Sequence, residues 1–200
     1  MNVAVFVSGR GSNLQAIVNS PGLKNHVQVK AVISDKADCR AFQIAKAQAI
    51  QTFNVGSKTG FISYDELAYH LEELKIDLIV LAGFLKLIPI KFINYYKGKI
   101  INIHPALLPS FGGPGMYGIN VHKAVFEASA KVSGATVHFI DDTYDTGKII
   151  MQKCVDITDV SSPEEIAERV LQVEHQILPL VIQKFAEGKI NIVDNRVIIN

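Results

Sequence analysis

The segment INIHPALLPS, residues 101–110, contains the end of a predicted buried strand and two polar side chains, Asn102 and His104. Residues 99–103 predict a short buried strand, and Pro105 ends it because proline has no N–H to donate to a strand ladder. Side chains two apart in a strand project to the same side, so Asn102 and His104 meet at the strand's exit. An amide that donates to an oxyanion and an imidazole that carries a proton suit catalysis at a carbonyl. The alternative is a strand end whose polar groups only satisfy nearby backbone atoms.

Before this segment, apolar runs alternate with helix-like stretches. We expect strands at 3–7, 27–33, 50–54 and 77–81, and helices at 14–19, 37–49 and 64–75. Strands and helices that alternate at these spacings give right-handed crossovers and a parallel sheet. Further on, residues 135–140 and 148–157 predict antiparallel strands added to that sheet. The predicted fold class is α/β, a Rossmann-like, mostly parallel sheet flanked by helices, with antiparallel strands in the C-terminal half.

The remaining elements are helical, apart from the end of the chain. A helix is expected at 119–129, and His122 on it is interpreted as structural or solvated rather than catalytic. Ser162, Pro163 and Glu165 form a helix start, with serine at the cap and proline in the first turn. Pro179 is predicted to kink or split the long helix that follows. Residues 190–200 indicate a peripheral hairpin or tail.

Length and composition exclude several classes of protein. Two hundred residues fit a single domain spanning 1–200, and the formal charge of +1 argues against a nucleic-acid or membrane-surface partner. No segment is apolar enough to span a bilayer, and the N-terminus has no signal-type pattern. Cys39 and Cys154 lie far apart and read as reduced thiols. These features predict a cytoplasmic protein.

The turn Ser8-Gly9-Arg10-Gly11-Ser12-Asn13 follows the first strand and opens a helix. Free N–H groups and the positive end of the helix dipole favour an anion there, and the glycines let the backbone approach it. Leu14 stands where a dinucleotide fingerprint needs its third glycine, and no P-loop Gly-Lys-Ser/Thr occurs. The turn therefore predicts a site for a single phosphate, with an ordinary tight turn as the alternative.

Two loops are candidates for ligand contact. The loop 83–89 is unusually apolar for a connection, so it either lines a pocket for a flat heteroaromatic ligand or packs under a neighbouring helix. The polar loop 141–147 follows the strand that contains His138. No HxH or HExxH spacing accompanies the histidines, so we expect no metal.

Taken together, these motifs resemble the phosphoribosylglycinamide formyltransferase family of folate-dependent enzymes. The resemblance covers nearly the whole chain. It rests on the motifs SGRGSNLQAI (8–17), LAGFLKLIP (81–89), INIHPALLPSF (101–111), GATVHFIDDTYDTGKII (134–150) and VEHQILPLV (173–181). The Asn-x-His-Pro-x-Leu-Leu-Pro motif followed by an aspartate loop is specific for formyl transfer, and the Gly-Ser-Asn turn narrows it to this family.

The resemblance implies a function and a set of roles. The expected reaction moves the formyl group of 10-formyltetrahydrofolate to the amine of phosphoribosylglycinamide, in de novo purine biosynthesis, without metal or covalent intermediate. It implies small-molecule substrates only, a monomer or homodimer, and a cis Leu108–Pro109 peptide. His138 is expected to help hold the aspartate loop. The implied catalytic residues are Asn102, His104 and Asp145; the substrate-binding residues are Gly11, Ser12, Asn13 and Glu174; and the folate-binding residues are Phe84, Leu85, Lys86, Leu87, Ile88, Asn102, Ile140, Asp141 and Asp142.

The chain departs from the family pattern in three places. The segment after Leu-Leu-Pro is lengthened into 111–118, which leaves its role open. An arginine often found before the third helix has no clear match around 60–63, where Lys58 is the nearest substitute. Position 171 is leucine, where a polar contact is often seen.

Four other functions fit the sequence less well. A methionyl-tRNA formyltransferase would need a second, basic domain, and a formyltetrahydrofolate hydrolase would need a regulatory domain. A sugar-nucleotide formyltransferase lacks the Gly-Ser-Asn turn. A nucleotide-binding module without chemistry could use the 8–13 turn and Asp35, but it gives Asn102, His104 and Asp145 no reason to converge.

Overall fold

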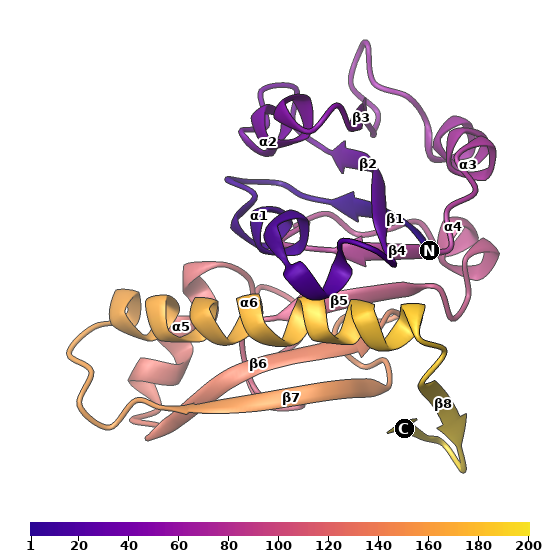
Figure 1. Cartoon of the computed structure of the whole chain (residues 1–200). Coiled ribbons are helices and arrows are strands. Elements are labelled where there is room, and N and C mark those ends of the chain that lie inside the picture. Colours follow the sequence, from indigo (N-terminus) through magenta and orange to yellow (C-terminus); the bar gives the residue numbers. More distant parts are fainter. The chain divides into compact units, whose positions relative to one another are not determined.

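The computed structural model describes all residues, 1–200 (Figure 1). Its contacts divide the chain into two compact units, Met1–Ile101 and Asn102–Asn200. The expectation of one domain over 1–200 stays a prediction, and each unit is described by itself.

Unit 1 is built on parallel strands. β1 (Asn2–Phe6) lies between β2 (Gln28–Ser34) and β4 (Leu78–Leu81), and β3 (Gln51–Asn54) pairs with β2. Residues 3–7 are fully buried, as expected of a strand covered on both faces. The helices are α1 (Ser12–Asn19), α2 (Ala41–Ala47), α3 (Tyr64–Glu73) and α4 (Ile90–Tyr95), with a 3-10 turn η1 (Pro21–Leu23). α4 and η1 were not predicted, and α2 begins later than expected.

Unit 2 carries the antiparallel part. β6 (Val132–Phe139) pairs with β7 (Ile149–Asp156), as predicted. α5 (Ile119–Glu127) precedes them, and the long α6 (Pro163–Ala186) lies along β6 and β7 (Figure 1). β8 (Ile190–Val193) and β9 (Arg196–Ile199) form the expected terminal hairpin.

The strand order confirms the predicted fold class. β5 (Ile100–His104) contains the boundary between the units, and the seven-stranded sheet runs β3-β2-β1-β4-β5-β6-β7. The pairs among β1 to β4 are parallel and β6–β7 is antiparallel. The Leu108–Pro109 peptide is cis, as the resemblance implied.

Of the two alternatives predicted for Pro179, the split of the helix is wrong, and a kink there stays a prediction. α6 runs as one helix of 24 residues through this position. A proline in a helix interior destabilises the helix by about 3 kcal/mol. Each large aliphatic side chain that the helix buries stabilises the folded state by about 1.5–3 kcal/mol. The neighbours Ile177, Leu178, Val181 and Ile182 are all buried, so their packing keeps the helix intact.

A glycine in β6 has no room for a side chain. A Cβ at Gly134 would overlap the backbone oxygen of Lys153 and approach Leu107 Cδ2 to 2.8 Å. We therefore expect Gly134→Ala to lower the free energy of unfolding by about 2–3 kcal/mol, measured by urea denaturation. Gly9→Ala is the control, because a Cβ there meets nothing within 4 Å, and it should lose no stability. Equal stability of the two variants would contradict the packing seen at β6.

Candidate functional site

A polar cluster in unit 2 joins four of the residues singled out from the sequence. His104 Nδ1 lies 3.6 Å from Asp145 Oδ2, and His138 Nε2 lies 3.6 Å from Asp145 Oδ1. Asn102 Nδ2 lies 3.2 Å from His138 Nε2. The Asp145 carboxyl therefore stands between two imidazoles, and the second imidazole contacts the amide at the end of β5.

His138 orients the Asn102 amide. Its Nδ1 lies 2.8 Å from the carbonyl of Phe139, which can only accept, so Nδ1 carries the proton. Burial lowers the pKa of His138, although the Phe139 carbonyl and Asp145 act in the opposite direction. The neutral ring then offers Nε2 as an acceptor to one N–H of Asn102. The arrangement fixes which end of the amide is the donor, which a site for an oxyanion requires.

His122 is a buried, neutral neighbour of this cluster. It lies on α5 with 5% of its surface exposed, and its Nδ1 is buried without a hydrogen-bond partner. Burial, and then the charge of His104, lower the pKa of His122 to about 4. The structural interpretation of His122 agrees with this burial, and its solvated alternative is wrong.

The aspartate loop has its own internal hydrogen bonds. Asp141 Oδ1 accepts from Thr143 N–H at 3.3 Å and from the Thr146 hydroxyl at 2.8 Å. Ile140 and Asp141 are half-buried and Asp142 is exposed. Their predicted contact with folate stays a prediction.

The 8–13 turn in unit 1 has the local form of an anion site. Gly11 adopts a φ of 82°, and a Cβ there would lie 2.7 Å from that of Ala41, so both conformation and space require glycine. α1 begins at Ser12, which is exposed, and Asn13 is buried. No side chain caps this helix end. The predicted phosphate contacts of Gly11, Ser12 and Asn13 stay predictions.

Ser8 ties this turn to the 83–89 loop. Its hydroxyl donates to Asp35 Oδ1 at 2.6 Å and accepts from the N–H of Leu85 at 2.9 Å. Its own N–H donates to the carbonyl of Gly83 at 3.0 Å. The sequence did not predict these partners of Ser8, because its place directly after a buried strand indicates a polar side chain at the strand's end but not what it contacts.

The 83–89 loop is partly packed and partly exposed. Phe84 and Ile88 are buried, and the Phe84 ring meets Phe6 edge-on at 5.3 Å between centroids. Leu85 is 45% exposed and Leu87 is 58% exposed, and Lys86 is exposed as well. Two large aliphatic side chains thus remain on its surface, while the rest of the loop anchors them.

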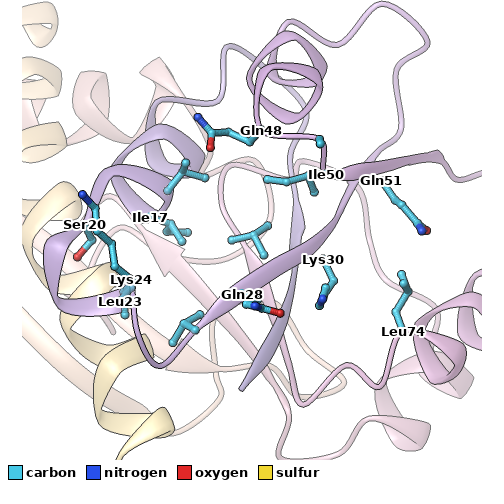
Figure 2. A pocket seen from close by; sticks show the side chains of 14 residues that line it. Ile17, Ser20, Leu23, Lys24, Gln28, Lys30, Gln48, Ile50, Gln51 and Leu74 are labelled. Atoms are coloured by element: carbon cyan, nitrogen blue, oxygen red, sulfur yellow. The ribbon is translucent and has the colours of Figure 1, made fainter.

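Glu174 and a hollow in unit 1 lie outside the polar cluster of unit 2. Glu174 is buried on α6 in unit 2. A hollow of about 600 Å³ lies in unit 1. Figure 2 shows side chains that line it, among them Gln28 and Gln51 at the amino ends of β2 and β3. No histidine or carboxylate lines this hollow, and its charged side chains are Lys24 and Lys30. It therefore contains none of the catalytic residue types predicted from the 101–110 segment and the 141–147 loop.

Comparison with known proteins identifies the family. The model of the formyl transferase family matches residues 1–182. The phosphoribosylglycinamide formyltransferase of Haemophilus influenzae is 37% identical over 198 residues, which cover 96% of this chain and 91% of that protein. The chain belongs to the phosphoribosylglycinamide formyltransferases of the formyl transferase family. This confirms the resemblance drawn from the motifs.

Other members of this family differ in length. The chloroplastic phosphoribosylglycinamide formyltransferase of Arabidopsis thaliana is 41% identical over 194 residues, covering 94% of this chain. The chain spans 66% of that relative and 62% of the one from Vigna unguiculata. The crystal structure of the phosphoribosylglycinamide formyltransferase from Anaplasma phagocytophilum matches with a TM-score of 0.90 at 36% identity, covering all of this chain and 93% of that one. This match agrees with the α/β fold.

Neither a membrane-spanning helix nor a metal-binding cluster is found in the chain. None of its helices has the length and apolar character needed to cross a membrane. No group of three or more His, Cys, Asp or Glu side chains has the arrangement of a metal site.

The depressed pKa of His122 predicts acid sensitivity. In the unfolded chain this histidine takes up a proton near pH 6.5, whereas in the folded protein it does so only near pH 4. The contribution of His122 to the free energy of unfolding is therefore complete above pH 6.5. It falls by up to about 3 kcal/mol as the pH is lowered to 4. Urea denaturation at pH 7, 5.5 and 4.5 should show a weaker pH dependence for His122→Leu than for the parent. Identical pH dependence would contradict the assignment.

Proposed function

We propose that this chain transfers the formyl group of 10-formyltetrahydrofolate to the amine of phosphoribosylglycinamide, in de novo purine biosynthesis. The observation that carries the proposal is the cluster of Asn102, His104, His138 and Asp145 in unit 2. The family relatives named for this activity support it. The chain spans 66% and 62% of its two plant relatives. That it carries the whole activity of such a protein is therefore also proposed.

Asn102 would stabilise the charge that develops on the formyl oxygen. The substrate amine attacks the formyl carbon, a C–N bond forms, and the carbonyl oxygen becomes an oxyanion. One N–H of Asn102 is directed to His138, which leaves the second N–H for this oxygen. Removing a single oxyanion donor costs other enzymes roughly 3–4 kcal/mol in the transition state.

His104 and Asp145 would handle the proton. The attacking amine loses a proton, and the folate nitrogen must gain one as its bond to the formyl carbon breaks. An imidazole can accept the first proton and return it to the leaving nitrogen, directly or through water. A carboxylate 3.6 Å away favours the protonated ring, so Asp145 would stabilise His104 while it holds the proton.

The remaining predicted residues would bind the two substrates. The N–H groups of Gly11, Ser12 and Asn13 at the start of α1 suit the phosphate of the ribonucleotide. Glu174 is proposed to contact its ribose. The pterin of the folate is assigned to the residues Phe84, Leu85, Lys86, Leu87, Ile88, Asn102, Ile140, Asp141 and Asp142. We also propose a reaction without metal, a cytoplasmic protein, and a monomer or homodimer.

Removing either member of the proton-handling pair should abolish most of the activity. We expect His104→Ala and Asp145→Ala each to lower kcat by at least about 100-fold while the protein stays folded. The measurement is formyl transfer from 10-formyltetrahydrofolate to phosphoribosylglycinamide, followed by absorbance. His26→Ala, an exposed histidine of unit 1, is the control and should retain parental activity. Near-parental turnover of either variant would refute the catalytic assignment.

The phosphate role makes a different prediction. Asn13→Ala should raise KM for the ribonucleotide by about tenfold or more with a smaller change in kcat, because it removes binding shared by ground and transition states. Asn19→Ala at the other end of α1 is the matched control. A loss confined to kcat would contradict phosphate binding at this turn.

The same assay separates the rival functions. A sugar-nucleotide formyltransferase would accept a sugar-nucleotide amine in place of the ribonucleotide, and a hydrolase would release formate without any amine. With 10-formyltetrahydrofolate as the donor, we expect turnover when phosphoribosylglycinamide is the amine, and none with a sugar-nucleotide amine or without an amine. Turnover with either rival system, and none with this substrate, would replace the proposal.

A further inference from the structure

Two residues that flank Gly112 contact the two members of the His104–Asp145 pair through their backbone. The carbonyl of Phe111 accepts from His104 Nε2 at 2.9 Å. The N–H of Gly113 donates to Asp145 Oδ2 at 2.9 Å. This is the start of the lengthened segment 111–118 that departs from the family pattern, and the proposed chemistry does not otherwise use it.

The bond to Phe111 decides which nitrogen of His104 can exchange a proton. A carbonyl oxygen only accepts, so His104 Nε2 must carry a hydrogen in both the neutral and the protonated ring. Nδ1 is then the nitrogen that gains and loses the proton, and it faces Asp145 Oδ2. At 3.6 Å the neutral Nδ1 and the carboxylate, which are both acceptors, form no hydrogen bond.

Gly112 allows one segment to reach both side chains. A Cβ at this position would lie 2.5 Å from Leu108 Cδ2 and 3.2 Å from Asp145 Cβ. Gly112 is not among the glycines with positive φ, so it is space rather than backbone conformation that requires glycine here. Phe111 on its other side has a φ of 54°, which is unfavourable for a residue with a side chain.

We propose that residues 111–113 are a positioning element that fixes His104 with its proton on Nε2 and directs Nδ1 toward Asp145 and the reacting atoms. Gly112 is the positioning residue on which this element depends. The inference rests on the proposed formyl transfer for its kinetic consequence. The tautomer of His104 is a property of the free protein and can be measured without any substrate.

The first test is the ¹⁵N NMR spectrum of the protein labelled at histidine, with His104→Ala used to assign the resonances. In the neutral ring of His104, the signal of Nε2 should be that of a protonated nitrogen and the signal of Nδ1 that of an unprotonated one. A proton on Nδ1 in the neutral parental protein would overturn the proposal. If the tautomer is as expected but no formyl transfer occurs, the proposed function fails and the positioning element stands.

The second test is Gly112→Ala. We expect kcat to fall by at least about tenfold with KM for both substrates changed less than about twofold, since small displacements of reacting groups cost this much or more. The neutral His104 signal should shift toward a mixture of tautomers. Ser110→Ala, an exposed neighbour in the same loop, is the control. Unchanged kcat and an unchanged tautomer in Gly112→Ala would overturn the role of Gly112.

A double variant separates positioning from general destabilisation. Leu108→Ala removes the atom closest to the new Cβ, so the effects of Leu108→Ala and Gly112→Ala on kcat should be non-additive, with partial recovery of the tautomer in the double variant. This comparison holds even if Gly112→Ala alone folds poorly. Strict additivity, with no recovery of the tautomer, would contradict the steric argument.

Discussion

The polar cluster of unit 2 depends on the hydrogen bonding of one nearly buried carboxylate. The Asp145 side chain is 12% exposed and stands 3.6 Å from each of two imidazoles. A buried charge is costly unless it is paired or hydrogen-bonded, and the burial that lowers the pKa of His138 keeps that ring neutral. The N–H of Gly113 therefore supplies a bond that neither neutral ring provides. Protonation of His104 would add the second partner.

Two histidines beside one carboxylate are given opposite tautomers by two backbone carbonyls. Phe139 accepts from Nδ1 of His138, which leaves Nε2 as an acceptor for the Asn102 amide. Phe111 accepts from Nε2 of His104, which leaves Nδ1 facing Asp145. The side chains of the cluster thus take their donor and acceptor roles from the main chain. A backbone carbonyl can accept a hydrogen bond but cannot donate one. Each carbonyl therefore permits only one tautomer of the neutral ring that it contacts.

The local parts of this arrangement could be predicted from the sequence and the distant parts could not. Because side chains alternate between the two faces of a strand, the sequence places Asn102 and His104 on the same face. Five residues of sequence were enough for this prediction. The alternation of strands and helices likewise predicted the sheet. Asp145 entered through resemblance, because no pattern links residues 41 apart. The Ser8 bonds to Asp35 and Leu85 span 27 and 77 residues and were missed for the same reason.

The glycines of segment 111–118 are required for two different physical reasons, which composition alone does not distinguish. Gly113, Gly115 and Gly118 have positive φ, so they serve the course of the backbone. Gly112 has no such φ and instead lies against Leu108 and Asp145. The contacts with His104 and Asp145 are made by residues 111 and 113 alone. The residues from 114 to 118 therefore take no part in these two hydrogen bonds, and the lengthening of the segment lies mainly beyond them.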